Sequence, residues 1–179
     1  MLNLSVSVAL EGELLNNILL IQDSLEKKYR IRFQKQHQTI PHINLYAGKI
    51  SNFNKILNYL ENYDFNSFKR KITFVGLGAF LEKTPIIYLR YLKSSNLIKF
   101  RYDLKTACNI WLEVDTYSTE DRWFPKTTIA MRDTNFKFIS SLDNIIKNFN
   151  FKKEMIIKRI LLIKFEKGKK EKLLKTIFM

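Results

Sequence analysis

The N-terminal part of the chain switches from alternating apolar positions to helical spacing and back again. Residues 2–10, LNLSVSVAL, alternate between apolar and small side chains, which predicts a strand. Residues 12–29 carry apolar side chains at helical spacing with charge on the other side, which predicts an amphipathic helix. The inner positions of this helix are Leu14, Ile18, Ile21 and Leu25. The next segments, RIRFQ at 30–34 and HINLYAG at 42–48, predict two further strands.

The middle of the chain predicts a helix, a pair of strands and a second helix. Ser51 is placed to cap the first of these helices. The inner face of that helix consists of Phe53, Ile56, Leu57 and Leu60. Residues 69–92 predict two strands around a turn, and the turn contains Lys83, Thr84 and Pro85. A helix from Ser94 would carry Cys108 and Trp111 in register on its inner face, where a cysteine is expected to be a small core residue rather than a nucleophile.

The C-terminal part predicts mainly strands. The expected elements are strands near 111–116 and at 127–132, 155–165 and 172–179, a polar loop at 118–123, a short helix near 140–148 and a turn at Gly168. Along the whole chain the order is βαββαββ followed by αββαββ. This order favours a bilobal, pseudo-symmetric α+β fold, with two antiparallel sheets and flanking helices around a central groove. With 179 residues, we expect a single two-lobed domain spanning 1–179.

Charge and cysteine content narrow the class of partner and the compartment. The formal net charge is +14, and the segment 151–179 holds ten Lys and Arg against three Glu. Such a field favours phosphate-bearing partners, although a solvated basic surface would have the same composition. A single cysteine excludes an internal disulfide and indicates a reducing compartment. The first residues lack a basic signal-peptide region, and no apolar run reaches the roughly 18 residues of a membrane span, so we expect a cytoplasmic protein without a membrane partner.

Two similar segments, one in each half, carry the candidate chemistry. IPHINLYAGK at 40–49 and DRWFPKTTIAMR at 121–132 both place a proline directly before a basic residue at the start of a strand. Alternate residues of a strand share a face, so His42 would lie beside Asn44 and Lys126 beside Thr128. Two strands from similar halves could then surround one ligand with two basic and two small hydrogen-bonding groups. That set suits a phosphodiester; the alternative is that both segments are ordinary strands.

At these residues the sequence resembles a known family. PHINLYAG and FPKTTIA resemble the paired His-x-Thr/Ser signatures of the two-histidine (2H) phosphoesterase superfamily, which includes 2′-5′ RNA ligase-like proteins and RNA 2′,3′-cyclic phosphodiesterases. GLGAF at 76–80 and the ending ILLIKF, GKKEK and KLLKTIF resemble other parts of those proteins. The resemblance implies that one histidine of each half acts as general base or general acid, that the Thr/Ser residues hold phosphate oxygens, and that no metal or other cofactor is required. A zinc-type Cys/His cluster is also missing from the sequence.

Residue by residue, His42 and Thr128 keep the residue types of the signatures, whereas Asn44 and Lys126 replace a Thr/Ser and a histidine. His42 matches the first histidine, Asn44 the first Thr/Ser and Thr128 the second, whereas Lys126 stands where the second histidine would be. Lysine has an unperturbed pKa of about 10.4, against about 6.5 for histidine, so it would stay protonated unless strongly desolvated. It therefore suits a phosphate anchor better than a proton shuttle. An arginine expected at the Met131 position stands one residue later, as Arg132, and strand alternation would turn it to the other face.

Three functions follow from these residues. The first is binding of a nucleotide or an RNA phosphodiester (cyclic, 2′-5′-linked or 2′,3′-cyclic) with weak or no hydrolysis, which would suit sequestering or sensing a nucleotide signal. The second is an active, metal-independent phosphodiesterase with His42 as general base and Lys126 as acid or electrostatic stabiliser. The third is a basic RNA-binding protein that uses the C-terminal region.

Several aromatic residues near the two segments are candidates for stacking on a base, although a core position is the favoured interpretation for each one taken singly. They are Tyr46, Phe80, Trp123 and Phe124. Trp123 is the preferred one because it belongs to the polar loop STEDRW. The second histidine of the chain, His37, lies five residues before His42, so a continuous strand would turn it away from the site.

Overall fold

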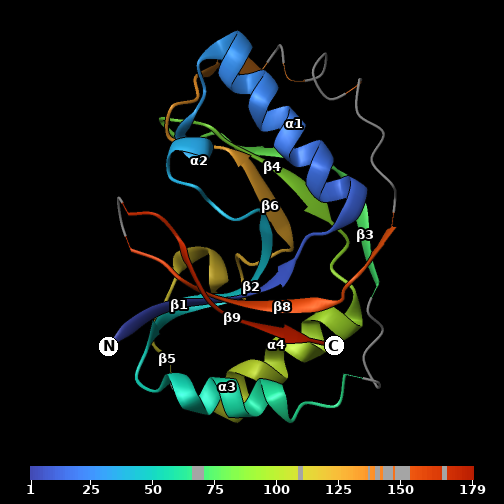
Figure 1. The fold of residues 1–179 in the computed structure, drawn as a ribbon, viewed down its shortest axis with the longest axis vertical. Coiled ribbons are helices and arrows are strands. Elements are labelled where there is room, and N and C mark those ends of the chain that lie inside the picture. The colour runs from blue at the N-terminus through green and yellow to red at the C-terminus, as the bar shows by residue number, and fades with distance from the viewer. Residues whose placement is uncertain are drawn as a thin grey trace.

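The structure is a computed structural model and describes residues 1–65, 71–108, 111–136, 138–139, 142, 147, 154–166 and 169–179, except for the side chains of 107 and 108. It contains two antiparallel sheets with helices packed against them (Figure 1). The expected α+β class and the two-sheet arrangement are therefore confirmed. None of the helices in the described part of the chain has the length and apolar content needed to cross a bilayer.

The larger sheet has five strands in the order β5-β2-β1-β8-β9. These strands are β1 (Leu2–Ala9), β2 (His42–Ile50), β5 (Trp111–Val114), β8 (Arg159–Lys164) and β9 (Lys172–Phe178). The alternation of the first segment is realised in β1, where Leu4, Val6 and Val8 are completely buried. Its small polar residues are buried as well, with Ser5 at 5% and Ser7 at 0% exposure. Both faces of β1 are therefore covered, and the serine face turns toward the second sheet and not toward solvent.

The smaller sheet has four strands in the order β6-β4-β3-β7. They are β3 (Lys71–Phe80), β4 (Ile86–Tyr91), β6 (Lys126–Ala130) and β7 (Glu154–Ile156). The expectation of one continuous strand over 155–165 is wrong. The chain pairs with β3 over β7, then leaves this sheet at the fully buried Ile157 and joins β1 as β8. An apolar run of this length can supply one strand to each of two sheets, because both strands need apolar residues on a buried face.

The helices lie on opposite sides of the molecule. Figure 1 shows α1 (Gly12–Tyr29) and α2 (Phe33–Gln36) beside the four-stranded sheet, and α3 (Phe53–Glu61) and α4 (Ser95–Cys108) below the five-stranded sheet. A short 3₁₀ helix, η2 (Thr116–Ser118), follows β5. The expected inner face of α1 is confirmed, because Leu14, Ile18, Ile21 and Leu25 are all buried.

Three local expectations are corrected. RIRFQ is not a strand, because Arg30 adopts a left-handed conformation that ends α1 and the carboxylate of Asp133 then accepts the main-chain N–H groups of Arg32 and Phe33 at the start of α2. The cap of α3 is Asn52, whose side chain accepts the N–H of Lys55, and not Ser51. Trp111 begins β5 and does not continue the helix. The side chain of Cys108, most of the expected helix at 140–148 and the turn at Gly168 lie outside the described residues.

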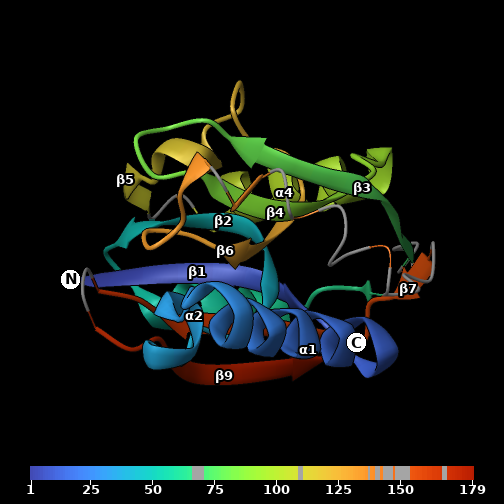
Figure 2. The same ribbon diagram turned by 90° about the horizontal axis from the view of Figure 1, so that it is seen from above.

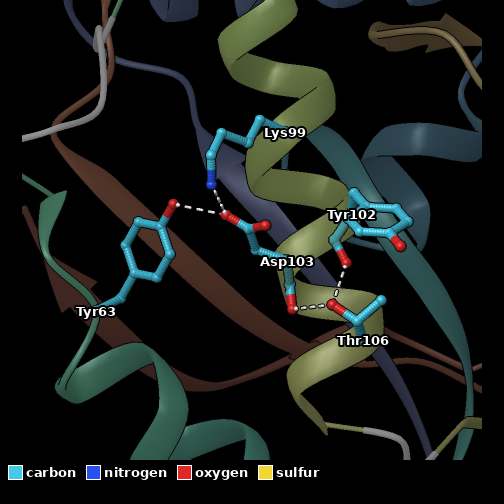
Figure 3. Close-up of polar contacts among 5 residues, drawn as sticks. All are labelled: Tyr63, Lys99, Tyr102, Asp103 and Thr106. Carbon is cyan, nitrogen blue, oxygen red and sulfur yellow. Dashed lines mark hydrogen bonds and ion pairs between the residues drawn. The ribbon is translucent and has the colours of Figure 1, made fainter.

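The outer and inner faces of α4 have different partners. Figure 3 shows the outer face, where the Asp103 carboxylate receives Lys99 Nζ at 2.6 Å and the Tyr63 hydroxyl at 3.4 Å. The Thr106 hydroxyl donates to the main-chain carbonyls of Tyr102 and Asp103, at 3.0 and 3.2 Å. The inner face carries the buried Arg101 toward β2. One helix thus connects the segment after α3 with the strand that holds the first motif.

Candidate functional site

A cavity of about 560 Å³ lies between the two sheets, and all four motif residues line it. His42 and Asn44 come from the start of β2, and Lys126 and Thr128 from β6. Figure 2 shows β2 and β6 side by side, although they belong to different sheets. The expected convergence of the two segments on one groove therefore occurs in the structure.

The ring of His42 is held in one tautomer. Its Nδ1 lies 2.6 Å from the carbonyl oxygen of Ile40, and since a carbonyl can only accept, Nδ1 carries the proton. The N–H of Ile40 in turn donates to the Glu171 carboxylate at 2.9 Å. Burial is the main cause that lowers the pKa of His42; the charge of Lys126 lowers it further, whereas Glu171 and the Ile40 carbonyl oppose the shift. His42 is therefore neutral at neutral pH, with Nε2 available as a proton acceptor.

Lys126 lies in an unusual environment for a lysine. Its Nζ is 5.3 Å from the ring centre of Tyr117 and 5.8 Å from that of Phe80, and these two rings stack on each other at 5.0 Å. Desolvation lowers the pKa of Lys126, and the nearby carboxylate of Asp115 partly offsets that shift. The Tyr117 hydroxyl donates to Glu82, a contact that raises the pKa of Tyr117 to about 12, so this phenol stays neutral. Desolvation is thus the main influence on the Lys126 ammonium, and it acts against the charged form.

Asn44 is held from both sides by hydroxyl groups beneath the cavity. Its Oδ1 accepts from Ser5 Oγ and its Nδ2 donates to Ser118 Oγ, both at 3.4 Å. Ser5 also shares a 2.6 Å hydrogen bond with the buried Ser7. Each amide nitrogen has two hydrogens, so one donor of Asn44 remains for a ligand. The serine face of β1 therefore orients the asparagine of the first motif.

Arg101 links η2 to β2 through hydrogen bonds to both elements. Its side chain is 6% exposed and donates to the carbonyl oxygens of Leu45, at 3.0 Å, and Ser118. The guanidinium lies 4.7 Å from the Trp123 ring and 5.0 Å from the Tyr46 ring. Arg101 was not predicted from the sequence, because a helical arginine usually projects into solvent.

The four aromatic candidates for base stacking occupy other places. Tyr46 is 3% and Trp123 4% exposed, and Trp123 Nε1 donates to the carbonyl of Asn44 at 2.9 Å. Both rings pack against Arg101, so the favoured core position holds for Tyr46 and Trp123, and Trp123 is not exposed for stacking on a base. Phe80 and Phe124 are half-buried and pack on each other with ring centres 5.8 Å apart. Neither belongs to the lining of the cavity, although Phe80 contacts Lys126.

The structure adds a second wall that the sequence did not predict. His37 and Arg132 were expected to turn away, yet both line the cavity, together with Phe33 and Gln34 of α2. Strand alternation fails for both residues: His37 caps α2, and Arg132 follows the end of β6 with a left-handed φ of 69°. The polar run QKQHQ, which lacks alternation, was the available signal against a strand at this position.

The charges around the cavity are unevenly paired. Lys49 lies 3.2 Å from Glu113, and Lys169 is paired with Glu166. Among the described residues, the remaining lining cations, Lys126 and Arg132, have no carboxylate in ion-pair contact. The same part of the chain contains no cluster of His, Cys, Asp and Glu arranged to hold a metal ion. The positive groups free to meet a ligand thus lie at the second motif.

Comparisons with known proteins identify the fold. No family model matches the sequence, and no curated protein matches it significantly. Among solved structures, Escherichia coli LigT in complex with ATP is similar, with a TM-score of 0.64, 13% identity, and coverage of 99% of this chain and 98% of LigT. TT0787 of Thermus thermophilus has a TM-score of 0.62 and 15% identity, with coverage of 98% and 97%. A structure described as a phosphoesterase has a TM-score of 0.56 and 12% identity, with coverage of 99% and 98%. The chain therefore has, over nearly its whole length, the fold that its resemblance to the two-histidine phosphoesterases implied.

Proposed function

We propose that this protein binds a nucleotide or an RNA phosphodiester in the cavity between β2 and β6, with weak or no hydrolysis. The observation that carries the proposal is the convergence of His42, Asn44, Lys126 and Thr128 on one cavity. Lys126 would provide a positive charge for the phosphate. The Thr128 hydroxyl and the remaining N–H of Asn44 would donate to its non-bridging oxygens.

The structural neighbours support this class of ligand. Crystal structures of E. coli LigT are described as complexes with ATP, 3′-AMP, NADP⁺ and phosphate. All of these ligands contain phosphate, and all but the last contain an adenine nucleotide. At 12–13% identity the likeness of these structures concerns the fold, so the ligand class is carried to this chain by the four residues above.

Weak or absent hydrolysis follows from the two basic groups together. His42 is suited to take a proton, because its pKa is lowered and its Nε2 is free. Lys126 is a cation whose two aromatic neighbours favour the charged state through their ring faces. A bound phosphate would favour that state further. Binding therefore keeps the proton on the lysine when a leaving group would need it.

The lowered pKa of Lys126 favours a second candidate, a working metal-independent phosphodiesterase. In this reaction His42 Nε2 would take a proton from an attacking water as its oxygen bonds to phosphorus. The ester bond on the opposite side would break, and Lys126 would give a proton to the departing alkoxide oxygen. The net reaction consumes one water and leaves one phosphomonoester, after which a proton passes from His42 to Lys126 through solvent.

The third function, RNA binding through the basic C-terminal region, has less support from the described residues. Lys158 and Arg159 contact Glu11, at 3.9 and 2.7 Å, and Lys164 lies 2.7 Å from Glu166. Lys175 lies 3.6 Å from Glu61. Much of the described positive charge in this region is thus offset locally, which weakens its attraction for a polyanion.

Native mass spectrometry and calorimetry would separate the first two functions. The freshly purified protein is first examined for a copurified nucleotide. A panel of 2′,3′-cyclic nucleotides and 2′-5′ oligoadenylates is then tested for binding and for product formation. Binding with intact ligand recovered after long incubation supports the proposal, and rapid conversion to a monoester establishes the phosphodiesterase instead. If no panel member binds and no nucleotide copurifies, both are refuted.

A further inference from the structure

The cavity is larger than its four motif residues require. A phosphodiester group fills only a small part of about 560 Å³, and cavities of this size hold whole small ligands. Part of its remaining wall is formed by α2 and by Arg132 after β6. We infer that this wall is the subsite for the nucleobase, an inference that rests on the proposed nucleotide binding.

Three planar groups lie in contact along this wall. The rings of Phe33 and His37 are 4.0 Å apart and inclined by only 23°. The guanidinium of Arg132 lies 4.8 Å from the centre of the Phe33 ring. Nucleobases stack on aromatic rings and on guanidinium planes with little sequence preference. Since His37 and Arg132 both line the cavity, a base can extend this stack from either of them.

Gln34 adds a directional donor to the same wall. It is 6% exposed, and its Oε1 accepts the Thr39 hydroxyl at 2.6 Å. With the oxygen engaged, the amide nitrogen is the group left to interact in the cavity that Gln34 lines. Every nucleobase has a ring nitrogen or carbonyl oxygen that can accept such a bond. Stacking and one hydrogen bond would therefore recognise a base, whereas a bare sugar phosphate would gain neither.

The wall is fixed before any ligand arrives. The Asp133 carboxylate accepts two main-chain N–H groups at the start of α2, at 2.7 and 2.8 Å. On the outer side, Lys35 reaches Asp23 and Glu26 of α1, at 2.7 and 2.6 Å. Anchoring at both sides means that little conformational entropy is lost when a base binds.

The test compares two probes by calorimetry: adenosine 2′,3′-cyclic phosphate and the base-free methyl riboside 2′,3′-cyclic phosphate. The wild type is expected to bind the adenosine compound about 5- to 100-fold more tightly, as stacking on one base implies. Arg132→Lys, which keeps the charge and removes the planar guanidinium, and Gln34→Leu should each remove a large part of this preference while changing the affinity for the base-free probe much less. Gln34→Leu removes the donor without adding a charge, and the Thr39 hydroxyl keeps the main-chain carbonyl of residue 34 as an acceptor. Lys28→Gln, which removes one charge from an exposed position of α1 outside the cavity lining, is the matched control and should keep the preference.

Failure of the subsite and failure of the proposed function have different signatures. If the wild type binds both probes equally, or if the two cavity variants weaken both probes by the same factor, the base subsite is refuted while phosphate binding stands. If neither probe binds, or if Lys126→Ala changes the affinity for neither, the proposed function itself is refuted.

Discussion

The replacement Lys126→His tests whether the protein lacks a proton donor or already contains one. The cavity retains a neutral His42 with its tautomer fixed by the Ile40 carbonyl, and it retains hydroxyl and amide donors for the phosphate. Among the departures from the pattern of its resemblance, Lys126 is the one that concerns proton transfer. A histidine there would have an unperturbed pKa of about 6.5, close to the working pH at which an acid both holds and releases a proton.

The size of the effect can be bounded. A positioned general acid contributes roughly 10²–10⁴-fold to a rate. This range corresponds to a reduction of about 2.7–5.4 kcal/mol in the activation barrier. Part of the gain would be lost, because burial that lowers the pKa of Lys126 would also lower that of a histidine in its place and leave it less protonated. We therefore expect Lys126→His to raise hydrolysis of 2′,3′-cyclic nucleotides by about 100-fold, at the lower end of that range.

Multiple-turnover hydrolysis followed by chromatography measures this change. Lys126→Arg keeps the charge without a transferable proton and should bind ligand while hydrolysing no faster than the wild type. The gain must disappear when His42→Ala is added, because the new acid acts together with the existing base. If Lys126→His hydrolyses more slowly than the wild type, the lysine is itself the working acid, and the interpretation of Lys126 as mainly an anchor is refuted.

Three further predictions concern stability and are measured by denaturant unfolding. The pKa of His42 is lowered from 6.5 in the folded protein, so the unfolded chain takes up the proton first as the pH falls. The free energy of unfolding should therefore drop by about 1.4 kcal/mol for each pH unit below 6.5, until the folded protein is protonated as well. His42→Gln should lose this part of the pH dependence. Arg101→Met should lower the free energy of unfolding by about 2–4 kcal/mol, because the buried carbonyls of Leu45 and Ser118 lose a charged donor. Lys99→Met, on the exposed face of the same helix, should lower it by less than about 1 kcal/mol, and equal losses would show that the hydrogen bonds of Arg101 do not stabilise the fold. Gly48→Ala should cost about 1–3 kcal/mol, because its Cβ would lie 2.1 Å from the carbonyl oxygen of Glu113, and an unchanged stability would show that β5 can move away freely.

The sequence predicted the elements whose signal is local. Alternation in β1 and helical spacing in α1 both correspond to buried faces of the structure. The error at RIRFQ has a non-local cause, since the partner that caps α2 is Asp133, one hundred residues away. The division of 155–165 between two sheets is likewise decided by pairing with β3 and β1, which an apolar run does not encode by itself.

At the site, the motifs were sufficient for the residues on strands and insufficient for those beyond them. His42, Asn44, Lys126 and Thr128 follow from strand alternation, and all four line the cavity. Arg132 was assigned to the wrong side because β6 ends at Ala130, after which the left-handed backbone replaces the alternating one. Trp123 was assigned to a surface loop, but its ring is covered by Arg101, which no local pattern connects with it.

The difference between the two halves of the site follows from one physical cause acting on two kinds of side chain. Burial lowers the pKa of both His42 and Lys126. For a histidine, whose unperturbed pKa is near neutrality, this shift secures the neutral form that a base or an acceptor needs. For a lysine the unperturbed pKa is about four units higher. Burial must therefore lower the pKa much further before the side chain can give up its proton near neutral pH. The faces of the Phe80 and Tyr117 rings, whose centres lie 5.8 and 5.3 Å from Lys126 Nζ, oppose this shift by attracting its cation. The same direction of shift thus secures a neutral histidine but leaves a lysine further from losing its proton, and a neutral histidine beside a cation is the combination that the proposed phosphodiester binding needs.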